Sequence, residues 1–521
     1  MVGRIIIITL SHHHITISSY YHIITSSSHR IRMNISGKHE TYTLNKPQLF
    51  LGLLLIVSPW IVLFITTKVL VHHSVFSSVP CWSDELAYWH EVLSFSQKGF
   101  NFGCYSMNEV LPKYLSFGAH GFGTVSVYAL FGTVFGWKTY SIVIANAFFM
   151  SLAFLCLSSI VKLSSKNLFY ILLFSLTYTP LILFTSTSMT ELLNLSVLTI
   201  YFVILYAYFK HGGKKLLVFL FVFCAAISFI RIIYIVLFLP LLFSRRGKFQ
   251  FNHKWLIYFI SWIVFSAFLF LLNNLFVSPY PDSFLNDLFS SNNINDFIFN
   301  FINHFFQNVG NLLNPFSDDK IQVLLRYFTI ISCIYCLVKS KILQSRFKSF
   351  TFEYFIVFLI LFSFILINIA AYDVFDWRDY RVLAPVLFGC VVFLILSGKR
   401  DMIYFSLAMN FLGVIFLIVS PEIVESFNKG RYTKPIENKV LNQIRYTENP
   451  ATRFQNTIVV QNFTKDIVMN VPAGIGITHA EELSDELQSN YIFSKNKLKL
   501  STYKIINSNE MGYLYQKVGA N

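Results

Sequence analysis

Two adjacent carboxylates stand near the start of the first long polar segment of the chain. Asp84 and Glu85 lie within residues 81–90, soon after an apolar run. A carboxylate in such a place can take a proton from a hydroxyl group or hold a metal ion. Read as a helix, the segment places Asp84, Tyr88 and Glu91 on one face. The alternative is helix capping by the preceding serine with two acids in the first turn, which is favourable without any catalytic role.

Charged side chains interrupt apolar sequence at three further places. Glu191 stands where one apolar run ends and the next begins, and Arg231 breaks an otherwise apolar stretch. Arg378, Asp379 and Arg381 occur together immediately before a later run. Charge at membrane depth is costly, so such residues need a reason to be there. Arginine forms forked bonds to phosphate oxygens, so the three arginines indicate an anionic headgroup or phosphate, with pairing to nearby acids as the alternative.

A histidine adds one more polar candidate. His120 lies in the glycine-rich sequence of residues 118–123. Its ring nitrogens can donate to a sugar hydroxyl or a phosphate oxygen, although a lone histidine beside glycines is more often a turn residue. We therefore treat His120 as a candidate for substrate binding. Asp84 and Glu191 are the candidate ligands should the chemistry need a divalent metal such as Mg or Mn.

The elements that must position these residues are membrane helices. Hydrophobic residues make up 55% of the 521 residues and charged residues 13%, whereas soluble domains carry roughly 25% charged residues. Apolar runs of about 20 residues recur, each long enough to cross a hydrocarbon core of about 30 Å as a helix. Only helices satisfy their own backbone groups in lipid without a partner, so we predict an all-α polytopic membrane protein. The net charge of +15 does not indicate a nucleic acid partner, because the basic residues sit in short loops between these runs.

The apolar runs predict about eleven spans. They cover residues 49–71, 140–161, 168–184, 192–209, 216–229, 232–243, 255–277, 321–338, 354–372, 382–396 and 402–420. Basic loops alternate along the chain in a way that places them and the N-terminus in the cytoplasm. The alternation requires residues 216–243 to form two short helices with Arg231 at the outer turn. It also requires residues 121–135 to lie at the outer interface without crossing.

Three parts of the chain follow from this division. Residues 1–46 are an N-terminal cytoplasmic extension that we expect to be disordered, with Met33 as a candidate true start. Residues 47–421 are the transmembrane domain, with a large first outer loop at residues 72–137. Residues 422–521 are more polar and contain a strand-like run at 457–461 and a helix-like run at 480–487. We expect them to form a small soluble α/β domain outside the membrane.

The layout of these features resembles the GT-C superfamily of membrane glycosyltransferases. The resemblance covers residues 49–420 and lies in layout more than in identity. Members have an acidic motif soon after the first span, matched here by Asp84 and Glu85, and interfacial helices in the same loop, matched by residues 87–97 and 121–135. Dolichyl-phosphate-mannose mannosyltransferases and aminoarabinose transferases share this layout, and many members end in a soluble outer domain.

Two later features extend the resemblance. A second outer loop of the family often carries an acid, matched by Glu191, and a late loop often enters a span through Arg-x-x-x-Pro, matched by Arg381 and Pro385. The acid pair departs from the spaced Asp-x-Asp of some branches, which leaves metal dependence open. The resemblance implies an inverting transfer of a hexose or pentose from a polyprenyl-phosphate donor to a glycan, lipid or protein acceptor. The reaction would occur on the outer face of a bacterial inner or cell membrane.

The roles implied by the resemblance follow the chemistry of glycosyl transfer. A carboxylate takes the acceptor proton, and cationic groups stabilise the leaving phosphate. The candidate catalytic residues are Asp84 and Glu85, and the candidate substrate-binding residues are Glu191, Arg231, Arg378, Asp379, Arg381 and His120. Two alternatives stay open: a lipid-linked oligosaccharide (O-antigen-type) polymerase, and a non-enzymatic lipid or polysaccharide transporter or flippase. The transporter predicts paired halves with interrupted helices, and no internal repeat is visible in the sequence.

Reporter fusions test the predicted orientation. Fusions after Lys215 and Lys348 should read as cytoplasmic, and a fusion after Asn521 should read as external, because basic loops stay on the cytoplasmic side. The reporters are a periplasm-active and a cytoplasm-active enzyme, compared at each position. A cytoplasmic C-terminus would contradict the prediction, since Asp84 and Arg378 would then fall on opposite faces of the membrane.

Overall fold

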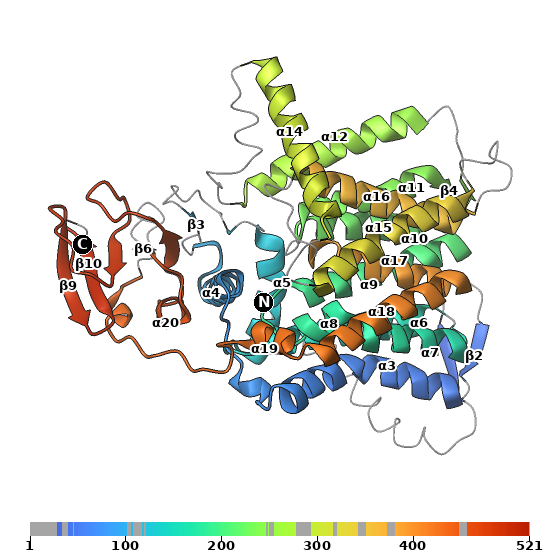
Figure 1. Ribbon diagram of the computed structural model, residues 1–521, viewed down its shortest axis with the longest axis horizontal. Helices are drawn as coiled ribbons and strands as arrows, with labels where there is room; N and C mark the ends of the chain where they lie inside the picture. The colour runs from blue at the N-terminus through green and yellow to red at the C-terminus, as the bar shows by residue number, and fades with distance from the viewer. Residues whose placement is uncertain are drawn as a thin grey trace.

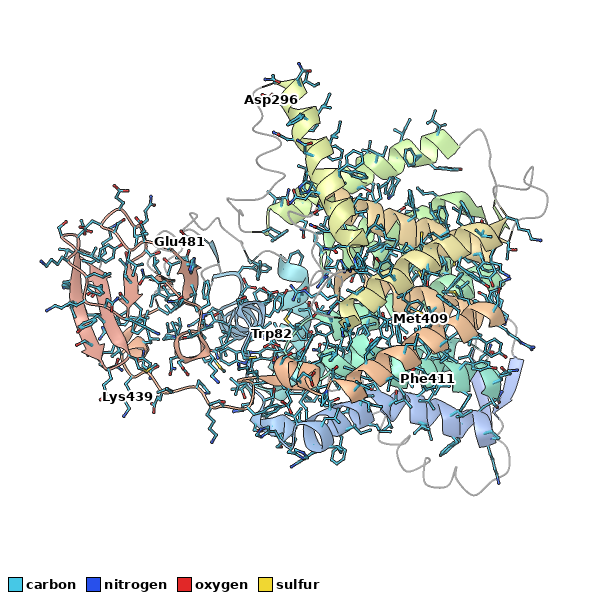
Figure 2. All side chains as sticks on the ribbon, viewed as in Figure 1. Trp82, Asp296, Met409, Phe411, Lys439 and Glu481 are labelled. Carbon is cyan, nitrogen blue, oxygen red and sulfur yellow. The ribbon has the colours of Figure 1, made fainter. Side chains whose placement is uncertain are left out.

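A helical bundle and a smaller region built on a β-sheet make up the structure, which is a computed structural model (Figure 1). It describes residues 29–33, 40–44, 46–101, 106–107, 117–118, 121–161, 163–245, 248–249, 255–277, 293–315, 320–341, 351–371, 381–446 and 456–519. The two parts have different surfaces. The bundle exposes apolar side chains such as Phe411, whereas the sheet region exposes charged ones such as Lys439 and Glu481 (Figure 2).

Seven helices in the described residues are long and apolar enough to cross a membrane. They are α3 (Lys46–Phe64, continued by the π-helical turn η1, Ile65–Leu70), α6 (Ser141–Ile160), α9 (Glu191–His211), α12 (Trp255–Asn274), α15 (Lys320–Ser340), α16 (Phe352–Ala371) and α18 (Arg400–Val419). Each coincides with a predicted run. The prediction of a helical membrane protein is therefore supported, while the number of eleven spans stays a prediction.

The other four predicted runs form shorter or broken helices. They are α7 (Ser165–Thr177) with α8 (Thr179–Phe184), α10 (Lys214–Ser228), the 3₁₀ helix η4 (Ile232–Phe238) with α11 (Leu239–Phe243), and α17 (Ala384–Leu396). Pro180 lies near the start of α8 and cannot donate a backbone hydrogen bond into the preceding turn, which explains the break at Tyr178. An apolar run thus marks burial, but it does not fix the length of the helix inside it.

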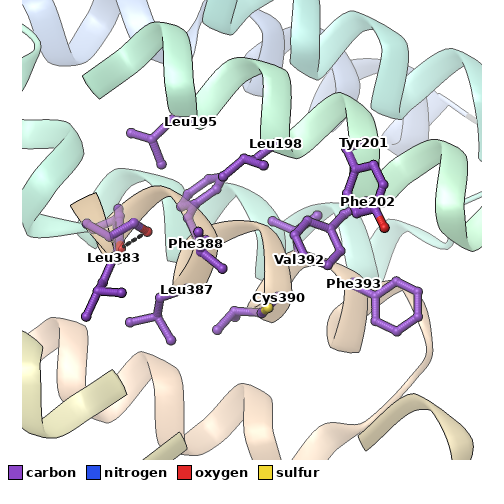
Figure 3. Close-up of a cluster of buried hydrophobic side chains, with 14 of the residues drawn as sticks. Leu195, Leu198, Tyr201, Phe202, Leu383, Leu387, Phe388, Cys390, Val392 and Phe393 are labelled. Atoms are coloured by element: carbon purple, nitrogen blue, oxygen red, sulfur yellow. Dashed lines mark hydrogen bonds between the residues drawn. The ribbon is translucent and has the colours of Figure 1, made fainter. Parts of the chain in front are cut away.

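One of these shorter helices, α17, lies at the centre of the bundle (Figure 1). Every residue of α17 is buried, and the helix packs against α9. Figure 3 shows aromatic and aliphatic side chains of both helices in this contact, among them Phe202, Phe388 and Phe393. A Cβ atom added at Gly389 would lie 2.3 Å from the Phe202 ring, so the glycine allows the two helices to approach this closely.

The basic loops gather at one end of the bundle, which we call the basic end. Gln48 Nε2 donates to the carbonyl of Leu163 at 3.0 Å, which joins the start of α3 to the turn before α7. The end of α15 meets the start of α18 through the Lys339–Asp401 ion pair at 3.2 Å. The loop before α18 also meets the start of α16, where Lys399 pairs with a glutamate at 3.2 Å. These contacts bring the starts of α3, α16 and α18 and the end of α15 to one end of the bundle, while the side of the membrane that this end faces stays a prediction.

Further helices lie at the opposite end of the bundle. They are η2 (Val75–Ser77), α4 (Ser83–Lys98), η3 (Gly99–Asn101), α5 (Phe122–Phe135), α14 (Ile294–Leu313) and α19 (Glu422–Asn428). The helices α4 and α5 cover the two segments that the sequence predicts as interfacial.

Two short hairpins lie elsewhere in the chain. They are β1 (His29–Met33) with β2 (Glu40–Leu44), and β4 (Ser244–Arg245) with β5 (Lys248–Phe249). The first hairpin falls within the extension that we expected to be disordered.

A six-stranded sheet forms the C-terminal region. Its order is β3 (Ser106–Met107), β7 (Gly476–His479), β6 (Thr457–Val460), β8 (Tyr491–Ser494), β10 (Gly512–Lys517) and β9 (Tyr503–Asn509). The short helices η6 (Leu441–Gln443) and α20 (Lys465–Val468) accompany it. Strand β3 comes from the first outer loop and pairs in parallel with β7. The division at residue 422 therefore leaves one strand of this sheet outside the predicted domain.

The predicted helix at residues 480–487 is wrong, whereas the predicted strand at 457–461 coincides with β6. One acid of residues 480–487, Asp485, binds the backbone of a later segment instead. The carboxylate of Asp485 accepts hydrogen bonds from the backbone N–H groups of Ser501 at 3.0 Å and Thr502 at 2.7 Å. Such side-chain to backbone bonds compete with helix formation, and the helical spacing of the sequence does not reveal them.

Candidate functional site

Four of the predicted site residues meet at the end of the bundle opposite the basic end. Arg381 Nη2 lies 2.9 Å from Asp84 Oδ2, and its Nε lies 3.8 Å from Glu191 Oε1. Arg231 Nη2 lies 3.4 Å from the same Glu191 oxygen. We call Asp84, Glu191, Arg231 and Arg381 the charge cluster. It contains two carboxylates and two guanidinium groups, so its charges balance.

The four residues come from four segments that the bundle brings to one end. Asp84 stands in the first turn of α4, and Glu191 is the first residue of α9. Arg231 lies between α10 and η4, and Arg381 lies just before α17. Glu191, Arg231 and Arg381 border apolar elements, where a charge can reach the bundle end while the neighbouring chain stays buried. The side chains of Asp84 and Arg381 meet although 297 positions separate them in the chain.

Exposure divides the charge cluster into an open and a closed half. The side chains of Asp84 and Arg381 are 41% and 27% exposed, whereas those of Arg231 and Glu191 are 12% and 2% exposed. Burial opposes the charge of Arg381, but the carboxylates of Glu191 and Asp84 outweigh this and raise the pKa of its guanidinium. A ligand arriving at this end can therefore reach Asp84 and Arg381 first.

Glu191 has an oxygen that the described residues do not satisfy. Its Oε1 faces Arg231 and Arg381, but its Oε2 is buried and has no hydrogen-bond partner among the described residues. A buried carboxylate oxygen without a donor is costly. A hydroxyl group of a ligand or a water molecule would satisfy it, so this oxygen points to the place where a polar ligand group would lie.

Glu85 is separated from this chemistry by its own partners. The side chains of Glu85 and Arg431 are both fully buried and pair at 2.8 Å. Oε1 of Glu85 also accepts the N–H of Ser188 at 2.8 Å, while Oε2 accepts the N–H groups of Cys81 at 2.9 Å and Trp82 at 3.2 Å. A glutamate at the third helical position commonly reaches back to the residue before the helix. We assign Glu85 a structural role in place of the predicted catalytic one.

A buried hydrogen-bond chain holds the turn that precedes Glu191. The hydroxyl of Tyr128 donates to Asn146 Oδ1 at 2.5 Å, and Asn146 Nδ2 donates to the carbonyl of Met189 at 2.8 Å. Tyr128 and Asn146 are both fully buried. Together with the bond from the N–H of Ser188 to Glu85, this chain fixes the backbone two residues before Glu191.

A second buried chain reaches the same turn from the side of Arg231. The hydroxyl of Tyr234 donates to Asn194 Oδ1 at 2.8 Å, and Asn194 Nδ2 donates to the carbonyl of Thr190 at 2.9 Å. The N–H of Tyr234 also bonds to the carbonyl of Arg231 at 3.0 Å. The backbone that carries Arg231 is thereby linked to the backbone that carries Glu191. Fully satisfied buried networks of this kind hold their members in one arrangement.

Sequence reasoning missed the residues that support the cluster. Arg431 lies in the polar tail that follows the last predicted span, and nothing in the sequence distinguishes it from a solvent-exposed arginine. The tyrosines and asparagines of the two chains lie in apolar runs, where nothing in the sequence marks their partners. Of the other predicted site residues, His120, Arg378 and Asp379 lie outside the residues that the structure describes.

A divalent metal does not fit the described part of the site as it stands. Among the described residues, no three His, Cys, Asp or Glu side chains lie close enough together to hold a metal ion. The two candidate ligands, Asp84 and Glu191, are bridged by Arg381, whose cationic group takes the place of a metal between them. A cation could enter only if Arg381 left. The expectation of Mg or Mn stays a prediction.

Glu91 lies on the same helix as Asp84, but it is buried among different partners. It is 4% exposed, and its Oε1 accepts the N–H of Gly118 at 2.5 Å. Burial raises the pKa of Glu91 to about 8, although the bond from Gly118 acts in the opposite direction. The acid is therefore largely protonated at neutral pH, which allows it to sit in an apolar place between α4 and the segment at residue 118.

The buried ion pair of Glu85 yields a stability prediction. Glu85→Met should lower the free energy of unfolding by about 3–5 kcal/mol, because Arg431 would remain buried without a counter-charge. The double variant Glu85→Met with Arg431→Met should recover part of this loss. Asp84→Asn is the matched control, since it removes a partly exposed partner and should cost only about 0–1 kcal/mol. Thermal unfolding of the purified protein in detergent measures all three. Equal losses in the single and double variants would contradict the buried-charge explanation.

Glu91 yields a pH prediction. The folded protein holds the Glu91 proton up to about pH 8, whereas an ordinary glutamate releases it near 4.5. The protonated acid thus stabilises the fold at low pH, and this contribution should be lost as the pH rises between these two values. Glu91→Gln mimics the neutral acid and should remove the loss. Thermal midpoints of wild type and variant, measured from about pH 5 to about pH 9, should diverge with rising pH.

The comparison of Glu91→Gln with wild type also removes the contribution of a neighbouring titratable residue, His90. Burial lowers the pKa of the adjacent His90 to about 4, so this histidine also affects stability in acid. It titrates in both proteins and cancels in the difference between them. Parallel curves for the two proteins across the whole range would show that Glu91 does not carry a buried proton.

Comparison with known proteins adds no family to this description. No protein-family model matches the chain, and no curated protein matches it either. The residues of the site and their geometry therefore carry the evidence for function.

Proposed function

We propose that this chain is an integral membrane glycosyltransferase. It transfers a hexose or pentose from a polyprenyl-phosphate donor to a glycan, lipid or protein acceptor, with inversion. The reaction takes place at the bundle end that carries the charge cluster. The observation that carries the proposal is the contact between Asp84 and Arg381 at 2.9 Å, with Glu191 and Arg231 beside it. A base for the acceptor and a cation for the leaving phosphate are the two groups that this reaction needs, and they stand side by side.

The proposed step uses the open half of the cluster. The acceptor hydroxyl oxygen attacks the anomeric carbon, and the bond from that carbon to the phosphate oxygen breaks. The phosphate leaves with the electron pair, and the hydroxyl proton passes to Asp84. Arg381 exchanges its bond with Asp84 for forked bonds to the phosphate, which frees Asp84 to act as the base. The partial exposure of both side chains supports this exchange.

The closed half of the cluster would hold the substrate. Arg231 holds Glu191 in place, and the unsatisfied Oε2 of Glu191 would accept a hydroxyl of the sugar or of the acceptor. Arg378, Asp379 and His120 are predicted to complete the phosphate and sugar contacts. In this proposal Glu191 binds and does not react, because it is 2% exposed and faces two arginines.

Two other functions compete with this proposal. An oligosaccharide polymerase is also a transferase, but it usually places its key residues in large middle loops, whereas Asp84 lies soon after the first long helix. A transporter or flippase predicts helices interrupted within the membrane. The break at Tyr178 interrupts an apolar run, so this alternative has a structural feature in its favour, whereas the break at Arg231 lies at the end of the bundle.

An activity assay decides between the three. The purified protein is incubated with a panel of labelled polyprenyl-phosphate sugars and candidate acceptors, and transfer is followed by loss of label from the donor. Transfer of single sugars supports the proposal, and chain growth from lipid-linked oligosaccharides supports a polymerase. Movement of labelled lipid across proteoliposomes without any transfer supports a flippase and would contradict the proposal.

Two substitutions separate chemistry from binding. Asp84→Asn keeps the size of the side chain and removes the base, so turnover should be lost while donor binding persists. Arg381→Ala should raise the donor KM about tenfold to a hundredfold, since a charge-assisted bond contributes roughly 1.5–3 kcal/mol. Glu422→Gln is the control, because it neutralises an exposed acid in the first turn of α19 outside the cluster. Near wild-type turnover by folded Asp84→Asn would show that the base is another residue.

A further inference from the structure

The helix α14 carries an exposed apolar stripe along one side. Six large apolar side chains of the helix are between 45% and 74% exposed, and their spacing places them within one arc of the helix. They are Ile294, Ile298, Phe299, Ile302, Phe306 and Leu313. The polar residues Asn300, Asn303 and Gln307 are also exposed and occupy a different arc. An apolar stripe of this size in contact with water would be unfavourable, so something apolar must cover it.

Both ends of α14 are capped, which makes the helix a fixed element. At its start, the side chain of Asn293 accepts the N–H of Asp296 at 2.8 Å. At its end, Arg326 of α15 donates to the carbonyls of Asn311 at 2.5 Å and Asn314 at 2.9 Å. Arg326 is only 2% exposed. A buried cation on the last carbonyls of a helix satisfies these acceptors and interacts favourably with the negative end of the helix dipole.

The inner side of the same helix packs on the bundle. His304 and Asn308 are buried, and Asn308 Nδ2 donates to the carbonyl of Ile369 in α16 at 3.0 Å. The exposed stripe is therefore what remains after the helix has buried its contact with the protein. It is not explained by the packing of the bundle.

The direction of α14 distinguishes it from the spans. It runs across the long axes of the spans at the bundle end that faces the C-terminal sheet, and Asp296 lies at its outer tip (Figure 1, Figure 2). The chain reaches this end through α12, and just after this helix the carbonyl of Phe276 accepts the N–H of Phe117 in the first outer loop at 2.8 Å. The helix α12 is itself a candidate span with few buried residues, so its apolar surface faces lipid.

We propose that α14 lies in the membrane interface, with its exposed apolar stripe packed against the acyl chains of the leaflet nearest the charge cluster. A lipid surface fits better than a protein partner for two reasons. The helix α12, which comes before it in the chain, is a candidate span with few buried residues, and α14 lies crosswise to the spans as an interfacial helix does (Figure 1). Asp296 is its one acidic residue, and it has no Lys or Arg, so burial of apolar surface and not attraction to anionic lipid holds it there.

Depth measurements in nanodiscs of neutral phosphatidylcholine test this placement. The full chain, with its seven native cysteines replaced, receives one spin label at position 299 or 306 of the stripe, or at position 303 or 307 of the polar arc. Labels at Phe299→Cys and Phe306→Cys should collide more with oxygen, which concentrates in lipid, than with a water-soluble nickel complex. Labels at Asn303→Cys and Gln307→Cys should show the reverse. The stripe should lie about 5–10 Å below the headgroup boundary.

Two results would overturn the proposal. Preference for the nickel complex on both arcs would mean that the stripe faces water. Protection of the stripe from both reagents would mean that protein, such as a second copy of the chain, covers it. If the cysteine-free chain does not fold, Phe306→Trp and Gln307→Trp in the otherwise unchanged chain replace the labels. Brominated lipid should then quench the added fluorescence of Phe306→Trp but not that of Gln307→Trp. The measurement does not depend on any catalytic activity.

Discussion

The arrangement of the site depends on the buried ion pair between Glu85 and Arg431. Both side chains are fully buried, so neither can be removed without leaving the other charge uncompensated. The pair joins the first turn of α4 to the segment that follows α18, and Glu85 also holds the N–H of Ser188 in the turn before α9. Three segments from the beginning, middle and end of the bundle therefore meet at one carboxylate, and the neighbouring Asp84 is placed by the same contact.

The helix α4 also connects the bundle to the C-terminal sheet. On the sheet side, the ring of His90 bonds to the carbonyl of Ile475 at 2.8 Å, and the N–H of Gly474 donates to Ser94 at 3.0 Å. Leu86 belongs to the hydrophobic core of the sheet region, and strand β3 of the same loop extends the sheet. One helix thus has the charge cluster at its start and the C-terminal region along its length. A displacement of that region would move Asp84.

The balance of charge in the cluster explains how it can exist at the end of a bundle that otherwise avoids charge. Two carboxylates and two guanidinium groups neutralise one another in the absence of a ligand. An anionic phosphate would add negative charge, which Arg381 attracts. It would compete with Asp84 for the same guanidinium group. The proposed reaction and the resting ion pairs are therefore alternative uses of one arginine.

The sequence by itself determined the membrane class and most helix positions, because apolar runs of sufficient length have few other physical solutions. It also marked Asp84, Glu191, Arg231 and Arg381, since charge beside apolar sequence is costly and stands out. It could not show that Glu85 is buried against Arg431. Both residues lie in polar segments, where a charged residue that is exposed to solvent cannot be distinguished by sequence from one that is paired. Nor could it distinguish the short, broken helices from full spans or assign β3 to the C-terminal sheet. These depend on contacts between residues that are far apart in the chain, and only the tertiary structure decides which of them form.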